Sequence, residues 1–178
     1  MKVEIIRHPT DADWMRCKAL ALGTEGKEAV TPPSDKWKLK ILAARHSPIR
    51  TLMFTIRMEV PYWVSVHYVR HKIGVEHYVR SQRNDRQHDY DRNAARQDVP
   101  VVHVMDLNAE ALITIIQKRL CGKAAKETRE MAGLIRDAVL ETNPEFCDVL
   151  IEPCMYHYYD GYCHEMKPCG HGIAEVYR

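Results

Sequence analysis

Cationic side chains are concentrated in one short segment of the chain, between positions 70 and 96. Seven Arg or Lys residues stand there against four acidic residues, whereas the net charge of the whole chain is only +2. A guanidinium group binds phosphate through two parallel hydrogen bonds, and a short basic segment in a near-neutral protein favours small anions over long polyanions. We therefore expect a site for a phosphate-bearing small molecule. The cations are Arg70, Lys72, Arg80, Arg83, Arg86, Arg92 and Arg96.

The two ends of this segment offer different groups. Arg70, His71 and Lys72 stand together at the end of an expected helix, and on their own they indicate only a solvated basic turn favoured by the helix dipole. Ser81 and Arg83 add a hydroxyl and a guanidinium, which together suit a phosphate. Ser81 has no adjacent base in the sequence, so we expect it to bind and not to act as a nucleophile.

A further cation, Arg119, lies on the apolar side of an expected helix. A buried arginine is costly unless it is paired. One interpretation is a structural ion pair with Glu127 or Glu130, or a side chain that reaches solvent along the helix surface. The other, which we favour, is an arginine presented to the base of a bound substrate. Its apolar neighbours at helical spacing are Leu112, Ile115 and Ile116.

The end of the chain, from Asn143 on, holds four of the six cysteines and three of the ten histidines. Thiolates and imidazoles are zinc ligands, but the spacing contains no C-x2-C pair, and unliganded cysteines are often small buried apolar residues. We assign no metal to the catalytic site and keep a structural zinc ion as one alternative, with an aromatic packing corner at positions 156–159 as the other. The residues are Cys147, Cys154, Cys163 and Cys169, with His157, His164 and His171.

Periodicity and turn residues predict the elements that must position these groups. Positions 74–99 are polar and lack a clear period, so we expect a long loop with short structured pieces. The expected strands are Met1–Arg7 and Leu52–Val60. The expected helices are Thr10–Leu22, one from the cap Ser34 to about His46, one from Pro61 toward His71, and Asp106–Thr142, which is either one long helix or two with a break at Gly122.

Length and composition favour one globular domain. A chain of 178 residues with 46% apolar and 28% charged residues can bury a sizeable core. We expect residues 1–145 to form the main domain and residues 146–178 to be a Cys/His-rich extension packed on it. The sequence has no apolar run of the length of a signal peptide or a membrane span. We therefore expect a cytoplasmic protein with reduced cysteines and no membrane partner.

Three stretches, in this order, resemble the flavin-dependent thymidylate synthase (ThyX) family. HSPIRTLMFTIRMEV (His46–Val60) is similar to that family's SPxEHxxFTF segment, and VRHKIGVEHYVRSQR (Val69–Arg83) is similar to its RHRxxSxxExSxR signature. LNAEALITIIQKRLCGKAAKETREMA (Leu107–Ala132) is similar to its long helix, which has an asparagine near its start and an arginine about three turns beyond.

The resemblance implies an α/β fold, a single domain with helices packed on a mixed sheet, assembled as a homotetramer with active sites shared between subunits. It implies flavin adenine dinucleotide (FAD) as cofactor, NADPH and methylenetetrahydrofolate as co-substrates, and reductive methylation of deoxyuridine monophosphate (dUMP) to thymidylate (dTMP). No nucleic-acid partner is implied. By position, the FAD contacts are Thr51, Arg70, His71, Lys72 and Asn108; the dUMP contacts are His67, Ser81, Gln82, Arg83 and Arg119; and Arg119 is the catalytic residue.

The chain departs from the family pattern in two places. The stretch Arg70–Arg83 is one residue longer than the signature, with Val75 and Val79 where the signature has serine and glutamate. Before the second strand, Thr51 replaces the family's histidine and Arg50 replaces its acidic neighbour. These positions lie where the resemblance places the folate or the loop over the flavin.

Two other functions stay open. One keeps the fold and the nucleotide site and catalyses a different one-carbon modification of a pyrimidine nucleotide, such as hydroxymethylation. The other is a nucleic-acid-binding protein with a zinc module in its Cys/His-rich end. Binding to oligonucleotides that depends steeply on salt would favour the second, and tight binding of mononucleotides would exclude it.

Overall fold

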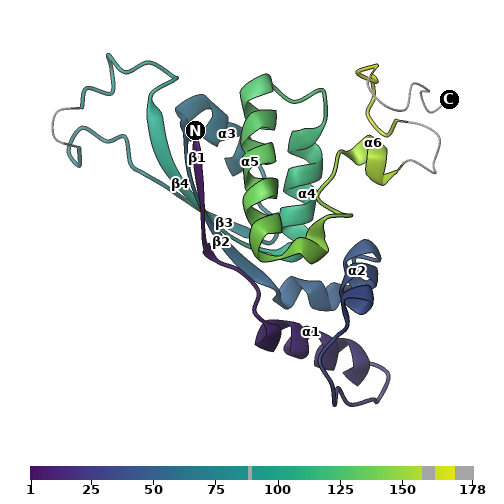
Figure 1. The fold of residues 1–178 in the computed structure, drawn as a ribbon. Helices are drawn as coiled ribbons and strands as arrows, with labels where there is room; N and C mark the ends of the chain where they lie inside the picture. The colour runs from purple at the N-terminus through teal and green to yellow at the C-terminus, as the bar shows by residue number, and fades with distance from the viewer. Residues whose placement is uncertain (88–89, 158–162, 171–178) are drawn as a thin grey trace.

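The computed structural model describes residues 1–87, 90–157 and 163–170. Four strands, β1 (Lys2–Arg7), β2 (Met53–Pro61), β3 (Val75–Val79) and β4 (Pro100–Asn108), form one sheet in the order β1-β2-β4-β3. The expected α/β fold, a single domain with helices packed on a sheet, is confirmed (Figure 1). Each neighbouring pair of strands is antiparallel, so the sheet is not the mixed one that the resemblance implies.

Alternating side chains give the sheet one buried face. In β2 every second residue from Phe54 to Val60 is buried, and in β4 every second residue from Val101 to Leu107 is buried. Two helices, α4 (Ala109–Leu120) and α5 (Lys126–Thr142), stand side by side over the sheet (Figure 1). The packing of this face therefore fixes the position of α4, which carries Arg119 in its last turn.

Polar side chains set the start of the two N-terminal helices, as expected. Thr10 and Asp13 form a reciprocal capping box at the start of α1 (Asp11–Gly23). Ser34 accepts a hydrogen bond from the backbone within the first turn of α2 (Asp35–Ala43). This second helix is shorter than expected because Arg45 adopts a left-handed φ of 50°. The 3-10 turn η1 (Ser47–Thr51) then leads into β2.

The expected helix from Asp106 to Thr142 is wrong at its start and right in its break. Asp106 and Leu107 belong to β4, where they pair with Thr55 and Phe54 of β2. Pairing between strands distant in sequence outweighs the local helical period. Between α4 and α5 the chain leaves the helix at residues 121–125, as the glycine at position 122 indicates.

The connection between β3 and β4 leaves the body of the domain. Residues 80–87 and 90–99 form an arm that projects from the sheet, on the left in Figure 1. The regular strand β3 lies within the segment that we expected to be a loop with short structured pieces. The helix expected after Pro61 is confirmed as α3 (Tyr62–Val69), with Arg70 as its C-cap.

The end of the described chain contributes little to the core. The 3-10 turn η2 (Pro144–Phe146) is followed by the short helix α6 (Pro153–Tyr156). Phe146, Val149 and Leu150 are buried, but no described residue beyond Leu150 is. Tyr158, Tyr159 and His171, which the sequence places in an aromatic corner or among metal ligands, lie outside the described residues. Among the described residues, no helix combines the length and the apolar character that crossing a membrane requires.

Candidate functional site

A cavity of about 710 Å³ opens between the end of α3, the turn that follows it and the start of α4. Four of the residues expected to bind the cofactor line it: Arg70, His71, Lys72 and Asn108. They come from segments almost forty positions apart in the sequence, and the antiparallel pairing of β3 with β4 brings these segments together. The volume of the cavity and the cationic side chains that line it suit an anionic small molecule.

Gly74 and Asn108 are packed directly against each other at this cavity. Gly74 has a φ of 72°, and a Cβ atom at this position would lie 2.6 Å from Asn108 Nδ2. Asn108 caps α4 by accepting a hydrogen bond from the backbone N–H of Ala111 at 2.9 Å, and its own backbone N–H donates to the Gly74 carbonyl at 3.0 Å. Only glycine therefore fits here, and the cap residue also lines the cavity.

Arg119 holds the imidazole of His71 and the end of α3. Its Nε donates to His71 Nε2 at 3.0 Å, and its Nη2 donates to the backbone carbonyl of His67. A guanidinium only donates, so His71 accepts at Nε2, and a neutral His71 carries its proton on Nδ1. Burial, and secondarily the nearby charge of Arg119, lowers the pKa of His71 to about 4. His71 is therefore neutral at physiological pH.

A second cavity of about 480 Å³ lies beside the first, and Arg119 lines this one. His71 and Thr114 border both cavities. Partial burial lowers the pKa of Arg119 from its usual range. The alternative interpretation of Arg119, an ion pair with Glu127 or Glu130, is not supported: none of the salt bridges in the described part of the chain involves Arg119.

His67, expected to contact the nucleotide, is held by α5. Its Nδ1 lies 2.8 Å from the hydroxyl of Thr128, whose backbone carbonyl accepts a hydrogen bond from the buried hydroxyl of Tyr68 at 3.0 Å. Burial, with a smaller contribution from Arg119, lowers the pKa of His67. These bonds fix the last turn of α3, the turn from which Arg70 and His71 emerge.

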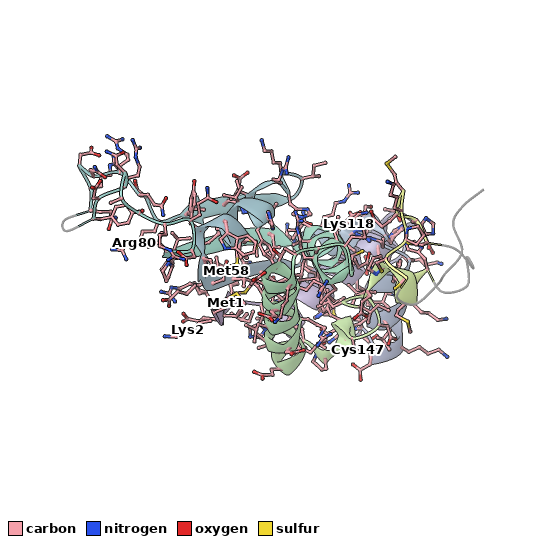
Figure 2. The ribbon with its side chains drawn as sticks, turned by 90° about the horizontal axis from the view of Figure 1, so that it is seen from above. Met1, Lys2, Met58, Arg80, Lys118 and Cys147 are labelled. Carbon is pink, nitrogen blue, oxygen red and sulfur yellow. The ribbon has the colours of Figure 1, made fainter. Side chains whose placement is uncertain are left out.

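The expected phosphate-binding residues lie elsewhere, at the base of the arm. Ser81 Oγ accepts a hydrogen bond from the backbone N–H of Arg83 at 3.3 Å, and Gln82 lies between them. Neither cavity described above is lined by these three residues. Figure 2 shows the separation, since Arg80 and Lys118, which directly precede Ser81 and Arg119, stand well apart. One chain thus does not bring Ser81 and Arg83 to Arg119.

The Arg83 guanidinium is engaged by a neighbouring carboxylate. It donates to both carboxylate oxygens of Asp85, at 2.9 and 2.6 Å. Both side chains are largely exposed. Further along the arm, Arg96 and Asp98 repeat this bidentate arrangement at 3.0 and 2.9 Å. An incoming phosphate would compete with Asp85 for the same two donors.

The rim of the first cavity differs from what the resemblance implies. The Thr51 hydroxyl donates to the Pro48 carbonyl at 2.8 Å, and Thr51 is not among the lining residues. Arg50 lines the cavity instead and forms an ion pair with Glu110 from the first turn of α4. Sequence reasoning missed Glu110, Thr114 and the role of Gly74; a single glycine in a sequence does not by itself indicate a close backbone approach.

A chain of hydrogen bonds also supports the turn after α3, and sequence reasoning missed it. Ser65 Oγ lies 3.0 Å from His103 Nδ1, His103 Nε2 lies 2.9 Å from His77 Nδ1, and His77 Nε2 lies 2.6 Å from the His71 carbonyl. A carbonyl only accepts, so His77 donates at Nε2. His77 Nδ1 can then accept from His103 Nε2, and His103 Nδ1 from the Ser65 hydroxyl, so that all three bonds run in one direction, from Ser65 to the turn. Burial, then the neighbouring His77, lowers the pKa of His103 to about 4.

No protein-family model matches the chain, and no curated protein matches its sequence. Solved structures do match it. One is a UMP/dUMP methylase, PolB from Streptomyces cacaoi, whose crystal structure is bound with 5-Br dUMP. The two chains share 14% sequence identity and superpose with a TM-score of 0.66 over 85% of this chain and 97% of that one. The chain therefore has the fold of this protein.

Proposed function

We propose that the chain is a flavin-dependent thymidylate synthase, which methylates the uracil of dUMP to give dTMP with FAD, NADPH and methylenetetrahydrofolate. The observation that carries the proposal is the convergence of Arg70, His71, Lys72 and Asn108 on one cavity. The sequence resemblance assigns these residues to flavin, and the fold is shared with a protein described as a UMP/dUMP methylase. A pyrimidine nucleotide is therefore the substrate class.

The residues of the first cavity fit a flavin nucleotide chemically. Arg70 and Lys72 offer cationic donors for its diphosphate, and the Asn108 amide, held against Gly74, can bond a polar ring edge or ribose. The cavity volume of about 710 Å³ lies in the usual range of cofactor and ligand sites. Bound flavin would supply the hydride that reduces the transferred carbon to a methyl group.

In this proposal the residues of the chain bind and orient the flavin and the nucleotide. His71 stays neutral and fixed in orientation because Arg119 occupies its Nε2 atom. Arg119, at the second cavity, places a half-buried guanidinium where its donors can polarise a carbonyl oxygen of the pyrimidine. Positioning and charge stabilisation are the contributions expected of a protein whose cofactor carries out the redox chemistry.

In this proposal the nucleotide site is built from more than one copy of the chain. Arg80, directly before Ser81, and Lys118, directly before Arg119, lie well apart in Figure 2, which supports phosphate contacts from one subunit and base contacts from another. We therefore include a homotetramer with shared sites in the proposal. Light scattering should give a mass about four times the 20.7 kDa of one chain.

A second candidate reaction keeps the same site. PolB is described as acting on UMP as well as dUMP, and the rim residue Arg50 stands where the family's acidic residue is found. Either the ribonucleotide as substrate or a different one-carbon product, such as the hydroxymethyl derivative, is compatible with the cavity. The assay below distinguishes these outcomes.

The test combines cofactor binding with product analysis. The purified protein should show the visible absorption of flavin or acquire it when FAD is added. It is then incubated with dUMP or UMP, methylenetetrahydrofolate and NADPH, and the nucleotide is analysed by mass spectrometry. A gain of one CH2 on dUMP supports the proposal, and the same gain on UMP or a gain of CH2O supports the second candidate. Bound flavin and nucleotide without any product would contradict a methyltransferase.

A further inference from the structure

One imidazole of the sheet, that of His77, reaches the turn that borders the first cavity. This turn follows α3, and its residues 70–74 all line the cavity. His77 is not among the lining residues, and it lies in the stretch where the chain departs from the family signature. The resemblance therefore gives His77 no role, and its function has to be inferred from its contacts.

Alternation in the edge strand β3 turns His77 toward the helices. Val75 is buried and Tyr78 is 62% exposed, so every second residue from Val75 points to the inner face of the sheet. His77 pairs with the fully buried Met105 of β4, and its ring lies 5.0 Å from that of His103, measured between centroids. The imidazole thus faces the layer that contains α3 and the turn after it.

His71 is held by groups from three elements. Its backbone N–H donates to the Tyr68 carbonyl of α3 at 3.0 Å, and its own carbonyl accepts from His77 Nε2 of β3 at 2.6 Å. Its imidazole accepts from Arg119 of α4 at 3.0 Å. The contact with His77 is the shortest of the three, and it anchors the start of the turn to the sheet.

The other end of the turn is anchored at Gly74. The Gly74 carbonyl accepts at 3.0 Å from the backbone N–H of Asn108, at the start of α4. Between the two anchors lie Lys72 and Ile73, which are exposed and line the cavity. A short segment fixed at both ends has few conformations open to it, whereas a free end would let it move. The place of the Lys72 ammonium group at the cavity therefore depends on both anchors.

His103 determines which nitrogen of His77 carries the proton. His103 Nε2 lies 2.9 Å from His77 Nδ1, and Ser65 Oγ lies 3.0 Å from His103 Nδ1. When Ser65 donates, His103 carries its proton on Nε2 and donates to His77 Nδ1, which leaves the proton of a neutral His77 on Nε2. This is the atom next to the His71 carbonyl. The chain of hydrogen bonds thus keeps His77 in the tautomer that can donate to the turn.

We propose that His77 is a positioning residue of the first cavity: its Nε2–H holds the His71 carbonyl and so keeps Lys72 where a flavin diphosphate binds. The inference deepens the proposed function, on which it rests for the identity of the ligand. His77 does not line the cavity and acts through the turn. Its donor to His71 is the feature that matters for binding, while its acceptor for His103 serves the core.

Two substitutions of His77 separate these two bonds. A glutamine amide reaches as far as Nε2 of histidine and can still donate to the His71 carbonyl, whereas an asparagine amide reaches only as far as Nδ1 and can still accept from His103. We expect the affinity for FAD, measured by fluorescence titration, to fall about fivefold or more in His77→Asn and to stay close to that of the wild type in His77→Gln. Without flavin, hydrogen exchange of a peptide containing residues 70–75, measured by mass spectrometry, should be faster in His77→Asn alone.

The outcomes separate this proposal from the proposed function. Equal affinities for FAD in the two variants, or a larger loss in His77→Gln, would overturn the role of His77. A wild type that binds no FAD would instead contradict the proposed function, and the exchange at the turn would still decide the role of His77, since equal exchange in the two variants would overturn it. If His77→Asn does not fold, nitrogen NMR of the wild type decides: we expect the proton of His77 on Nε2, and a proton on Nδ1 would overturn the proposal.

Discussion

The Nε atom of Arg119 donates a hydrogen bond to Nε2 of His71 at 3.0 Å, so a cation from α4 and an imidazole from the turn after α3 share one contact. A protonated His71 would place a second proton donor against a guanidinium. The contact therefore favours the neutral imidazole, and burial acts in the same direction to lower the pKa of His71. His103, buried below the same turn, is also held neutral.

Acid should begin to weaken the fold at a pH above the usual range of carboxylates. In the unfolded chain histidine takes up a proton near pH 6.5, but folded His71 and His103 have pKa values of about 4. The unfolded state thus binds more protons in this range, and the free energy of unfolding falls as the pH drops from about 6.5 to about 4. Two pKa shifts of about 2.5, at about 1.4 kcal/mol per pH unit, set an upper limit of about 7 kcal/mol. Because His71 is partly exposed, we expect a loss on the order of 5 kcal/mol, measured by urea unfolding at a series of pH values.

A matched pair of variants separates this effect from general acid lability. His103→Gln removes one of the two groups, so its unfolding free energy should depend less on pH than that of the wild type. His46→Gln, at the N-cap of η1 and outside this chain of hydrogen bonds, is the matched control for the substitution itself. A His103→Gln protein with the slope of the wild type would show that folding does not change the pKa of His103.

Gly74 should be intolerant of any side chain for two separable reasons. Gly74→Ala forces a side chain into a φ of 72° and places its Cβ 2.6 Å from Asn108 Nδ2. Gly26→Ala imposes the same strain at a φ of 69° but meets nothing within 4 Å. We expect Gly26→Ala to lower the free energy of unfolding by about 1 kcal/mol and Gly74→Ala by more. Gly74→Ala alone should also weaken FAD binding, measured by fluorescence titration.

The contact between Gly74 and Asn108 shows where sequence reasoning succeeded and where it stopped. Local signals sufficed for the caps Thr10 and Ser34, because each is settled within one turn of helix. The resemblance brought Arg70 and Asn108 to one site, and the structure places both at one cavity. The contact between Asn108 and Gly74 depends on the pairing of β3 with β4. No local sequence pattern predicts this pairing.

His103 and Arg119 illustrate the same limit. His103 stands in a β-strand where alternation turns it inward, and its partners Ser65 and His77 come from two other elements. The sequence offers no motif for such a chain. For Arg119 the helical period correctly put a cation on the apolar side, and we favoured a role at the substrate base over an ion pair with an acid of α5. Neither interpretation included its actual contacts with His71 and the His67 carbonyl. Contacts between side chains of different helices and strands are set by how these elements pack, which the sequence pattern of one element does not show.

The ion pair on the arm should compete with nucleotide binding. Asp85 occupies both donor positions of Arg83, and exposed pairs of this kind contribute at most about 1 kcal/mol. Asp85→Asn should therefore tighten dUMP binding by about threefold, whereas Arg83→Ala should weaken it by about thirtyfold, both measured by isothermal titration. Neither change should alter the affinity for deoxyuridine, which lacks the phosphate.

The second bidentate pair of the arm provides the control for charge alone. Asp98→Asn makes the same change in net charge beside Arg96, in a pair of nearly the same geometry. If the phosphate binds Arg83, Asp98→Asn should leave the affinity for dUMP close to that of the wild type. Equal tightening by both aspartate variants would mean that the arm attracts nucleotide only through its overall charge.

Shared active sites should allow two inactive variants to restore each other. In our proposal each site takes Arg119 and His71 from one subunit and Arg83 from another. Arg119→Ala and Arg83→Ala proteins should each lose methyl transfer, but when the two are co-expressed some sites combine a native Arg119 with a native Arg83. Random mixing gives about a quarter of the sites this combination, so turnover should recover to about a quarter of the wild-type rate.

A third variant, His71→Ala, tests whether the complementation depends on the arm. Arg119 and His71 contact each other within one chain, so no mixture of Arg119→Ala with His71→Ala can place both native residues in one site. That mixture should stay inactive under the same co-expression. Recovery in both mixtures would mean that one of the variants keeps activity of its own. If neither mixture recovers although mixed tetramers form, Arg83 and Arg119 do not meet across a subunit interface, and the phosphate must bind elsewhere.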